Sequence, residues 1–565
     1  MKFRAAVAAV VLSTLTLVGC VPPHPEPVPL QVLSFNDFHG HLEPPAGTDA
    51  NLGALDPISP ADPVGGSEYL ATTLTQLRAN HANTLTATAG DLIGGTPFLS
   101  GLFHDEPAVE ALEKMGLDVS SVGNHEFDEG LTELIRMQYG GCHPADGCYF
   151  PNDPYDGAKF PWLAANVQYP SGQSVLPPTW VNEVGGVKVG FIGMTLEGTP
   201  DVVSASGIQG LSFEDEVETA NVQAFELQSQ GVQAIITLIH EGGVQVAGST
   251  FDQCNGISGP IVDIATNLDP AIDMVISGHT HQPYVCDIAD PAGQPRKVTS
   301  ASSFGRVVTE TNLDLDPKSG DVIRSSVESV NHKVVRTVAP DPALTAVITK
   351  WKAIADPIAN QVVGSVTAPI TRSITRDTES SLANLIADAQ LAATDGPTEG
   401  SSVIALMNPG GVRADITFDP SPAGEAPGEV TFGEAFTTQP FGNLLVRMDL
   451  TGAQLVQVLQ EQAPTATRTT TLILGVSNGL TFDYDSAAAP GSRVSNVALN
   501  GTAIDPAATY RVTVNSFLAD GGDSFATLKL GTNRLIEGDD LTAFTDHLGA
   551  NSPVDPPATD RIDGV

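Results

Sequence analysis

The stretch Gly123-Asn124-His125-Glu126-Phe127-Asp128 constrains the fold of this chain more than any other part of the sequence. It follows the apolar run Val119–Val122, which predicts a buried strand, and it precedes a predicted helix start at Gly130-Leu131. A strand that ends in Asn-His brings an amide oxygen and an imidazole to the carboxyl end of a sheet, where α/β proteins commonly keep their chemistry. Alone, such a pair is usually only a polar turn. Here four other polar loops repeat the arrangement, which favours a shared site.

The other four loops also follow predicted strands. Apolar runs alternate with helical segments from Leu30 to about Val338, a pattern typical of a layered α/β domain. The four runs and the polar groups that follow them are Gln31–Phe35 with Asn36-Asp37-Phe38-His39-Gly40-His41, Leu85–Ala89 with Gly90-Asp91, Ala234–Ile239 with His240, and Ile272–Ser277 with Gly278-His279-Thr280-His281. Between them we expect helices at about Pro107–Met115 and Phe213–Gln230, and a further strand at Val187–Gly193.

The polar groups at these strand ends form a metal-ligand set. They are carboxylates, an amide and imidazoles, which suit hard or borderline divalent ions such as Mn²⁺ or Zn²⁺. Asp91 stands alone after a glycine and is the natural carboxylate to bridge two ions. Such a pair of ions generates a hydroxide near neutral pH and holds the entering and leaving oxygens of an in-line displacement. Each fragment by itself is more often a surface or capping pair, but their combination predicts a site for two divalent cations.

Residues 1–19 are predicted to be a targeting segment rather than part of the fold. Lys2 and Arg4 precede the apolar run Ala5–Val18, which is too short to span a bilayer. The following Leu17-Val18-Gly19-Cys20 resembles a bacterial lipobox, in which Cys20 becomes the lipidated N-terminus; the alternative is an ordinary signal peptide with an incidental cysteine. Residues 20–29 are rich in proline and predict an extended tether. We therefore expect an exported protein of the cell envelope, periplasm or exterior, held at a membrane only by its lipid.

Charge and cysteine content agree with an exported protein that does not bind nucleic-acid polymers. The 565-residue chain has 26 Lys and Arg against 66 Asp and Glu, a net charge of −40, which repels nucleic-acid backbones. A phosphate substrate must then be captured by local arginine or metal charge. The four cysteines after Cys20 most simply pair as neighbours, Cys142 with Cys148 and Cys254 with Cys286. Zinc binding by these cysteines is the alternative, but the C-x-x-C spacing is missing.

A second domain follows a predicted linking helix at residues 339–362, in which Pro357 should stop or kink the helix. This second part carries Arg372 and Arg376, and then a buried strand, Val403–Met407, that ends in Asn408-Pro409-Gly410-Gly411-Val412-Arg413. Gly-Gly lets the backbone approach a ligand, and arginine is the side chain best matched to phosphate. Solvated surface arginines are the alternative. In a chain so poor in basic residues, the pattern favours an anion site.

The N-terminal motifs resemble the signature of calcineurin-like metallophosphoesterases, and the whole order of motifs resembles the bacterial 5′-nucleotidase / UDP-sugar hydrolase family. The resemblance implies an N-terminal four-layer α/β/β/α sandwich at residues 30–338, a linking helix at 339–362 and an α+β substrate-binding domain at 363–565. It also implies two divalent ions (Mn, Zn, Co or similar), one held by Asp37, His39, Asp91 and His281, and the other by Asp91, Asn124, His240 and His279. His125, oriented by Asp128, would stabilise developing charge without binding metal.

The resemblance extends to the C-terminal half through Gln439-Pro440-Phe441-Gly442-Asn443, Asn515-Ser516-Phe517 and Gly521-Gly522-Asp523. It implies that two rings, Phe441 and Phe517, sandwich the base, and that Asn443 and Asp523 contact base or ribose. The phosphate groups would be held by Arg372, Arg376, Asn408 and Arg413. Pro409 stands where relatives often have Gly, which would stiffen that loop. In this family the second domain rotates to carry nucleotide to the metals, so we expect the pivot in or beside the linking helix.

Taken together, the sequence predicts an exported, dinuclear-metal nucleotide phosphohydrolase that releases phosphate from 5′-nucleotides, with UDP-sugars or other nucleotide diphosphates as further substrates. The alternatives on the same scaffold are a 2′,3′-cyclic nucleotide phosphodiesterase and a hydrolase of sulfur compounds. A non-catalytic nucleotide-binding lipoprotein is a third alternative, but such a protein has no need of the acidic, amide and imidazole groups together. The oligomeric state does not follow from the sequence.

Overall fold

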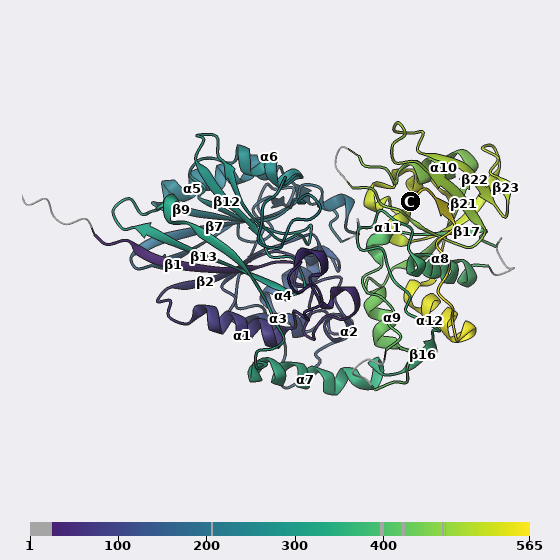
Figure 1. The fold of residues 1–565 in the computed structure, drawn as a ribbon, viewed down its shortest axis with the longest axis horizontal. Helices are drawn as coiled ribbons and strands as arrows, with labels where there is room; N and C mark the ends of the chain where they lie inside the picture. The colour runs from purple at the N-terminus through teal and green to yellow at the C-terminus, as the bar shows by residue number, and fades with distance from the viewer. Residues whose placement is uncertain (1–24, 205–206, 396–400, 420–423, 466–467, 469) are drawn as a thin grey trace, which may run out of the picture.

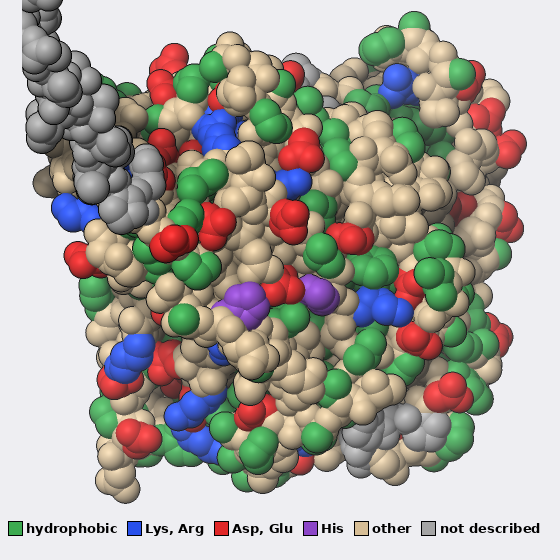
Figure 2. Space-filling view, turned by 60° about the vertical axis from the view of Figure 1, so that its left-hand side comes forward, with side chains coloured by type: hydrophobic (Ala, Val, Ile, Leu, Met, Phe, Trp, Pro, Cys, Tyr) green, Lys and Arg blue, Asp and Glu red, His purple; other side chains and the backbone are tan. Residues whose placement is uncertain are grey.

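The computed structural model describes residues 25–204, 207–395, 401–419, 424–465, 468 and 470–565, and shows two α/β domains side by side (Figure 1). The predicted signal peptide and Cys20 lie outside the described residues. Among the described residues, no helix combines the length and the apolar character that crossing a bilayer requires. Acidic side chains are scattered over the face drawn in Figure 2, as the net charge of −40 leads one to expect.

The first domain is built on two sheets. One has the strand order β14-β13-β1-β2-β3-β4, with β15 paired to β13. Its strands are β1 (Val28–Phe35), β2 (Thr84–Ala89), β3 (Val119–Ser121), β4 (Trp162–Leu163), β13 (Val307–Asp316), β14 (Asp321–Val322) and β15 (Glu328–Lys333). The other has the order β11-β12-β10-β9-β7-β6, with β6 (Thr179–Val184), β7 (Val187–Thr195), β9 (Ala234–His240), β10 (Met274–Ser277), β11 (Tyr284–Ala289) and β12 (Pro295–Ser300). A short pair, β5 (Val167–Gln168) and β8 (Ser212–Phe213), stands apart.

Helices cover the outer face of each sheet, and three hydrophobic clusters define the resulting four layers. Val32 of β1 and Ile236 of β9 belong to the cluster between the sheets, whereas Leu33 of β1 packs outward and Ile235 of β9 packs outward on the other side. This alternation follows from the two-residue period of a strand. The helices of this domain are α1 (Ser67–Arg78), α2 (Phe98–Gly101), α3 (Glu106–Met115), α4 (Leu131–Tyr139), α5 (Glu216–Ser229) and α6 (Pro260–Asn267). The predicted α/β/β/α sandwich is confirmed.

The predicted linking helix is α7 (Pro342–Ala359), which packs on the first domain and reaches the second domain at its C-terminal end, where Ala359 contacts Gly433 (Figure 1). Asp341 caps its start by accepting from the N–H groups of Ala343 and Leu344. Trp351 is 2% exposed and donates through Nε1 to Glu110 at 2.8 Å. The expected stop at Pro357 is wrong, since the helix continues for two residues to Ala359, whereas the alternative, a kink at Pro357, stays a prediction.

The second domain has a five-stranded sheet with the order β20-β17-β24-β19-β25 and a four-stranded sheet with the order β23-β22-β21-β26. Their strands are β17 (Ile404–Met407), β19 (Leu444–Thr451), β20 (Gly475–Val476), β21 (Leu480–Tyr484), β22 (Val494–Leu499), β23 (Thr502–Ala503), β24 (Thr509–Asn515), β25 (Thr532–Asp539) and β26 (Ile562–Asp563); β16 (Val362–Ser365) pairs with β18 (Glu429–Thr431). The helices are α8 (Ser381–Ala393), α9 (Phe432–Thr438), α10 (Gly452–Gln460), α11 (Ser516–Ala519) and α12 (Asp540–Asn551). The domain is therefore α+β, as expected.

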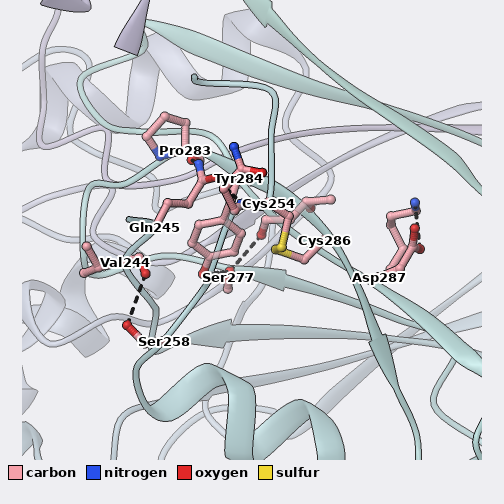
Figure 3. The surroundings of a disulfide bond; sticks show 12 residues. Val244, Gln245, Cys254, Ser258, Ser277, Pro283, Tyr284, Cys286 and Asp287 are labelled. Carbon is pink, nitrogen blue, oxygen red and sulfur yellow. Dashed lines mark hydrogen bonds and ion pairs between the residues drawn. A yellow bond between two sulfur atoms is a disulfide. The ribbon is translucent and has the colours of Figure 1, made fainter. Parts of the chain in front are cut away.

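Both predicted disulfides are present, Cys142–Cys148 and Cys254–Cys286. The second joins β11 to the loop that precedes α6 (Figure 3). Beside it, the Tyr284 hydroxyl lies 2.7 Å from Ser277 Oγ, at the end of β10. This cross-link and the buried hydrogen bond stabilise the base of the loop that carries His279 and His281.

Candidate metal centre and substrate cavity

Five strand ends from the two sheets of the first domain meet at one place. Asp37 and His39 follow β1, Asp91 follows β2 and Asn124 follows β3, while His240 ends β9 and His279 and His281 follow β10. The parallel pairing of β1 with β2, β2 with β3 and β9 with β10 puts their carboxyl ends at common sheet edges. All seven predicted ligands are thus brought together, and their side chains are largely buried.

The distances within this cluster suit shared cations. Asp91 is central, with its Oδ2 3.0 Å from His240 Nε2 and 3.6 Å from His39 Nε2. On one side, Asp37, His39 and His281 place ligand atoms within 4.8 Å of one another, and on the other side Asp91, His240 and His279 do so. Asn124 Oδ1 lies 3.1 Å from His279 Nδ1. The carboxylate of Asp91 therefore stands between two groups of ligand atoms, as a bridging ligand must.

Backbone carbonyl groups fix the orientation of two of the imidazoles. His39 donates from Nδ1 to the Gly94 carbonyl at 2.8 Å, and His240 donates from Nδ1 to the Ala89 carbonyl at 2.7 Å. A carbonyl only accepts, so both rings carry their proton on Nδ1 and turn the Nε2 lone pair inward. Metal-binding histidines are typically held in this way by a hydrogen bond on the other ring nitrogen.

The backbone at the ligands is strained. Five candidate ligands have φ in the left-handed region, which non-glycine residues rarely adopt: Asp37 (50°), His39 (44°), Asp91 (51°), His279 (69°) and His281 (56°). Each such residue costs on the order of 1 kcal/mol or more, and such residues cluster at functional sites where the surrounding structure holds them. The fold therefore includes an unfavourable backbone conformation at these five residues, and this conformation orients their side chains towards one another.

Glu126 holds the loops that carry Asp91 and Asn124. Its buried carboxylate accepts from the N–H groups of Asp91 at 3.0 Å and Leu92 at 2.8 Å, and from that of Gly123. Sequence reasoning assigned no role to this residue. Its position three residues after Gly123, in the same motif, was the only available signal.

The donor set of this cluster fits divalent cations. The Nε2 atom of His240 is fully buried and makes no hydrogen bond, although it lies close to Asp91. A buried nitrogen lone pair without a partner is costly, and a cation bound beside it and the carboxylate would satisfy both. Imidazole, carboxylate and amide groups together are the ligands of Mn²⁺, Zn²⁺ and similar ions rather than of soft ions. The residues present therefore match the group that the sequence predicts.

His125 lies beside the cluster with a different environment. Its Nδ1 donates to Asp128 Oδ2 at 2.8 Å, and its backbone N–H donates to Asp91 Oδ1 at 2.9 Å. Burial opposes the charged imidazolium, but the carboxylates of Asp128 and Asp91 outweigh it and raise the pKa of His125. His41, by contrast, packs its ring on Phe304 at a centroid distance of 4.0 Å and has no place in the cluster.

A cavity of about 130 Å³ opens next to this cluster and lies between the two domains. The first domain lines it with Asn124, His125, Asp128, His279 and the segment 202–204, which sequence reasoning missed because it carries no motif. The second domain lines it with Arg376, Asn408, Gly410, Gly411, Arg413, Phe441, Asn443, Phe517 and Asp523. One cavity therefore joins the candidate metal ligands to seven of the eight predicted substrate-binding residues.

The arginines of this cavity favour an anion. The rings of Phe441 and His125 stack with 5.8 Å between their centroids. The Arg413 guanidinium carbon lies 5.7 Å from the centroid of the Phe441 ring. Burial, together with the positive charges of Arg376 and Arg372, lowers the pKa of Arg413 to about 10. Among the described residues, no carboxylate forms an ion pair with the side chain of Arg376 or Arg413. Asp523 opposes the charge of Arg376, and Asp128 and Asp91 oppose that of Arg413, from a longer distance than an ion pair. Two half-buried guanidinium groups without a close carboxylate partner attract phosphate.

Arg372 is the predicted substrate residue that does not line the cavity. Its guanidinium forms an ion pair with Asp49 of the first domain and donates to the Arg413 carbonyl. In this conformation it joins the domains. Phe98 of α2 reinforces the contact by packing edge-on against Phe432 and Phe436, at centroid distances of 5.8 and 5.3 Å.

Comparison with known proteins agrees with this architecture. The family model "Calcineurin-like phosphoesterase" matches residues 30–283, and "5′-nucleotidase, C-terminal domain" matches residues 362–530. The crystal structure of a 5′-nucleotidase precursor from Thermus thermophilus superposes with a TM-score of 0.77 at 26% identity, over 95% of this chain and 99% of that one.

Two similar proteins are longer than this chain. Endonuclease YhcR of Bacillus subtilis (strain 168) is 32% identical over 527 residues, which cover 93% of this chain and 40% of that protein. Cell wall protein Lmo0130 of Listeria monocytogenes serovar 1/2a is also 32% identical over 527 residues, covering 89% of this chain and 64% of that protein. The chain thus spans less than two thirds of the length of either relative.

Proposed function

Because this chain belongs to the 5′-nucleotidase family of calcineurin-like phosphoesterases, we propose that it releases phosphate from 5′-mononucleotides at a centre of two divalent cations. Membership makes it a hydrolase of phosphoric esters that uses divalent metal. The substrate, the number of ions and the residue roles are our proposal. The observation that carries it is the single cavity lined by candidate metal ligands on one side and by arginines and phenylalanines on the other.

One ion would be held by Asp37, His39, Asp91 and His281, and the other by Asp91, Asn124, His240 and His279. The central position of the Asp91 carboxylate and the inward lone pairs of His39 and His240 support this assignment. Two such ions lower the pKa of water and neutralise charge on a phosphate group. Mn²⁺, Zn²⁺ and Co²⁺ all suit the ligand set.

The nucleotide would lie with its phosphate at the metal ligands and its base in the second domain. Arg376, Arg413 and Asn408 are placed to bind phosphate oxygens, and Arg372 would join them once its ion pair with Asp49 is broken. Phe441 and Phe517 line the same cavity and would stack on the base, with Asn443 and Asp523 near the base or ribose. Stacking contributes about 1–3 kcal/mol per base and tolerates different bases.

His125 would act on the phosphate or the leaving oxygen rather than on metal. Asp128 accepts its Nδ1 proton, so Nε2 is the nitrogen that is free to contact substrate in the cavity. The Asp128 carboxylate raises the pKa of His125, and a protonated ring would stabilise negative charge as it develops on the oxygen of the departing nucleoside.

We also propose that the protein acts outside the cytoplasm and is held at a membrane by a lipid anchor at Cys20. The name of the Listeria relative supports a location in the cell envelope.

We further propose that the second domain rotates relative to the first. The packing of α7 on the first domain supports a pivot after Ala359, since the hydrogen bond between Trp351 and Glu110 attaches the helix to that domain. A disulfide made by Gly47→Cys with Asp415→Cys, whose β-carbons would lie 3.7 Å apart across the domain contact, should stop turnover and leave nucleotide binding, and a reductant should restore turnover. Undiminished turnover of the oxidised variant would contradict the rotation.

The activity is tested by phosphate release from AMP. Protein dialysed against EDTA should be inactive and should recover with MnCl₂ or ZnCl₂. Asn124→Ala should abolish release, while the matched control Asn152→Ala, on an exposed loop, should leave it unchanged. ATP, UDP-glucose, 2′,3′-cyclic AMP, a thiosulfate ester and single-stranded DNA form the substrate panel. Faster turnover of one of the last three than of AMP would overturn the nucleotidase assignment.

A further inference from the structure

Asp49 carries a negative charge at the contact between the two domains. It lies in the short helix η1 (Gly47–Ala50), and its carboxylate forms ion pairs with Arg372 of the second domain and with Arg306 of its own domain, the latter at 3.7 Å. The side chains of Asp49 and Arg372 are only 16% and 13% exposed, so water screens their attraction less than at an open surface. A carboxylate of the protein itself therefore occupies an arginine that the proposed function assigns to the phosphate of the substrate.

The side chain of Arg372 retains an unused hydrogen-bond donor. Its Nη1 donates to the Arg413 carbonyl and its Nη2 to Asp49, whereas Nε is buried and makes no hydrogen bond within the described part of the chain. The carboxylate of Asp415 lies 3.9 Å from Nε and accepts instead from the backbone N–H of Arg372, at 2.9 Å. A buried donor without an acceptor is unfavourable, and the terminal oxygens of a phosphate group would serve Nε and the Nη groups together.

Arg372 is close enough to the other two arginines to act with them on one anion. It donates to the carbonyl group of Arg413, and burial together with the positive charges of Arg376 and Arg372 lowers the pKa of Arg413. Among the described residues, Arg376 and Arg413 form no ion pair with a carboxylate, whereas Arg372 does. The three guanidinium groups thus belong to one positive cluster, and Asp49 engages only one of them.

Asp49 keeps a partner if it releases Arg372. The side chain of Arg306 is 11% exposed, and its guanidinium carbon lies 5.1 Å from the centroid of the Phe304 ring. A buried charge that loses its only partner is strongly destabilising, and the remaining pair with Arg306 avoids this cost. A phosphate monoester carries about −1.5 to −2 charges near neutral pH, so it attracts a guanidinium more strongly than a carboxylate does at the same distance. Arg372 can therefore exchange one partner for the other.

We propose that Asp49 competes with the phosphate of the ligand for Arg372, so that ligand binding replaces the ion pair between the domains and product release restores it. The inference rests on the proposed function, because it takes Arg372 as a phosphate ligand, and it adds a regulator of that site on the first domain. Each ligand that uses Arg372 must break the same ion pair, so Asp49 lowers the affinity of phosphate ligands by a common factor. A ligand without phosphate, such as adenosine, does not meet this competition.

Inorganic phosphate and adenosine test the competition, since neither is hydrolysed. Isothermal titration calorimetry of the full-length, Mn²⁺-loaded protein measures the Kd of each. Asp49→Asn keeps the size of the side chain and removes its charge, so the Kd of phosphate should fall on the order of 10-fold, as expected for one hydrogen bond between charged groups, while the Kd of adenosine stays unchanged. Glu43→Gln is the matched control, because it removes a carboxylate that pairs with Lys352 of α7 at 3.0 Å, and it should bind both ligands as wild type does.

The Arg372→Gln protein shows whether the gain depends on Arg372. In that protein, Asp49→Asn should leave the Kd of phosphate unchanged. An equal Kd of phosphate in wild type and Asp49→Asn, a gain that persists without Arg372, or an equal gain for adenosine would each overturn the proposal. Asp49→Ser repeats the test if far-ultraviolet circular dichroism shows that Asp49→Asn does not fold. None of these measurements depends on turnover, so failure to release phosphate from AMP would contradict the proposed function and leave the competition for Arg372 standing.

Discussion

The substitution Gly123→Ala tests whether the backbone positions Asp91. A β-carbon at this glycine would be nearest to Asp91 Oδ1, and would lie 2.6 Å from Asp91 N and 2.9 Å from Asp91 Cγ. Real β-carbons essentially never come within 3.0 Å of another atom, and here backbone as well as side chain is too close. Overpacking of this kind costs about 1–3 kcal/mol of folding free energy. Since φ of Gly123 is not in the left-handed region, the effect is purely steric.

Relief of the clash must shift the loop that carries Asp91. A misplacement of about 1 Å at a reacting centre lowers the rate on the order of 100-fold. We therefore expect kcat/KM for AMP to fall at least about 100-fold, bound metal at the centre to fall with it, and the free energy of unfolding in EDTA to drop by about 1–3 kcal/mol. Gly538→Ala, where the added carbon meets nothing within 4 Å, is the control. Activity and metal content of Gly123→Ala within threefold of wild type would refute this account of the site.

Three other outcomes are expected. Phe517→Ala should raise KM for AMP by roughly 5- to 150-fold with little change in kcat, because about 1–3 kcal/mol of stacking is lost; a change confined to kcat would contradict it. Burial opposes the charge of His104, but Glu129 outweighs it and raises the pKa to about 9, so its stabilising contribution is complete below about 6.5 and is lost as pH rises towards 9. Denaturant titrations of wild type and His104→Gln in EDTA should therefore converge over that range. Replacing both Cys254 and Cys286 with Ser should lower the free energy of unfolding by roughly 3–4 kcal/mol, measured the same way, since the closed loop spans 32 positions.

Sequence alone predicted the layered first domain and the seven candidate metal ligands that the structure brings together. This was possible because strand ends leave a local pattern: an apolar run such as Val119–Val122 buries a strand, and the polar residues after it must lie at the sheet edge. The family resemblance predicted that these two domains occur together in one chain, which the spacing of the motifs alone could not predict.

Tertiary structure alone decided what depends on contacts between distant segments. It turned Arg372 towards Asp49 and out of the cavity, attached α7 to the first domain, and brought the segment 202–204 to the cavity wall. It also placed His104 against a loop some forty positions later in the chain. These outcomes rest on the packing of whole elements and on which charges find each other when the domains meet. No window of neighbouring residues contains that information, whereas each strand end of the candidate metal cluster is marked by its own local motif.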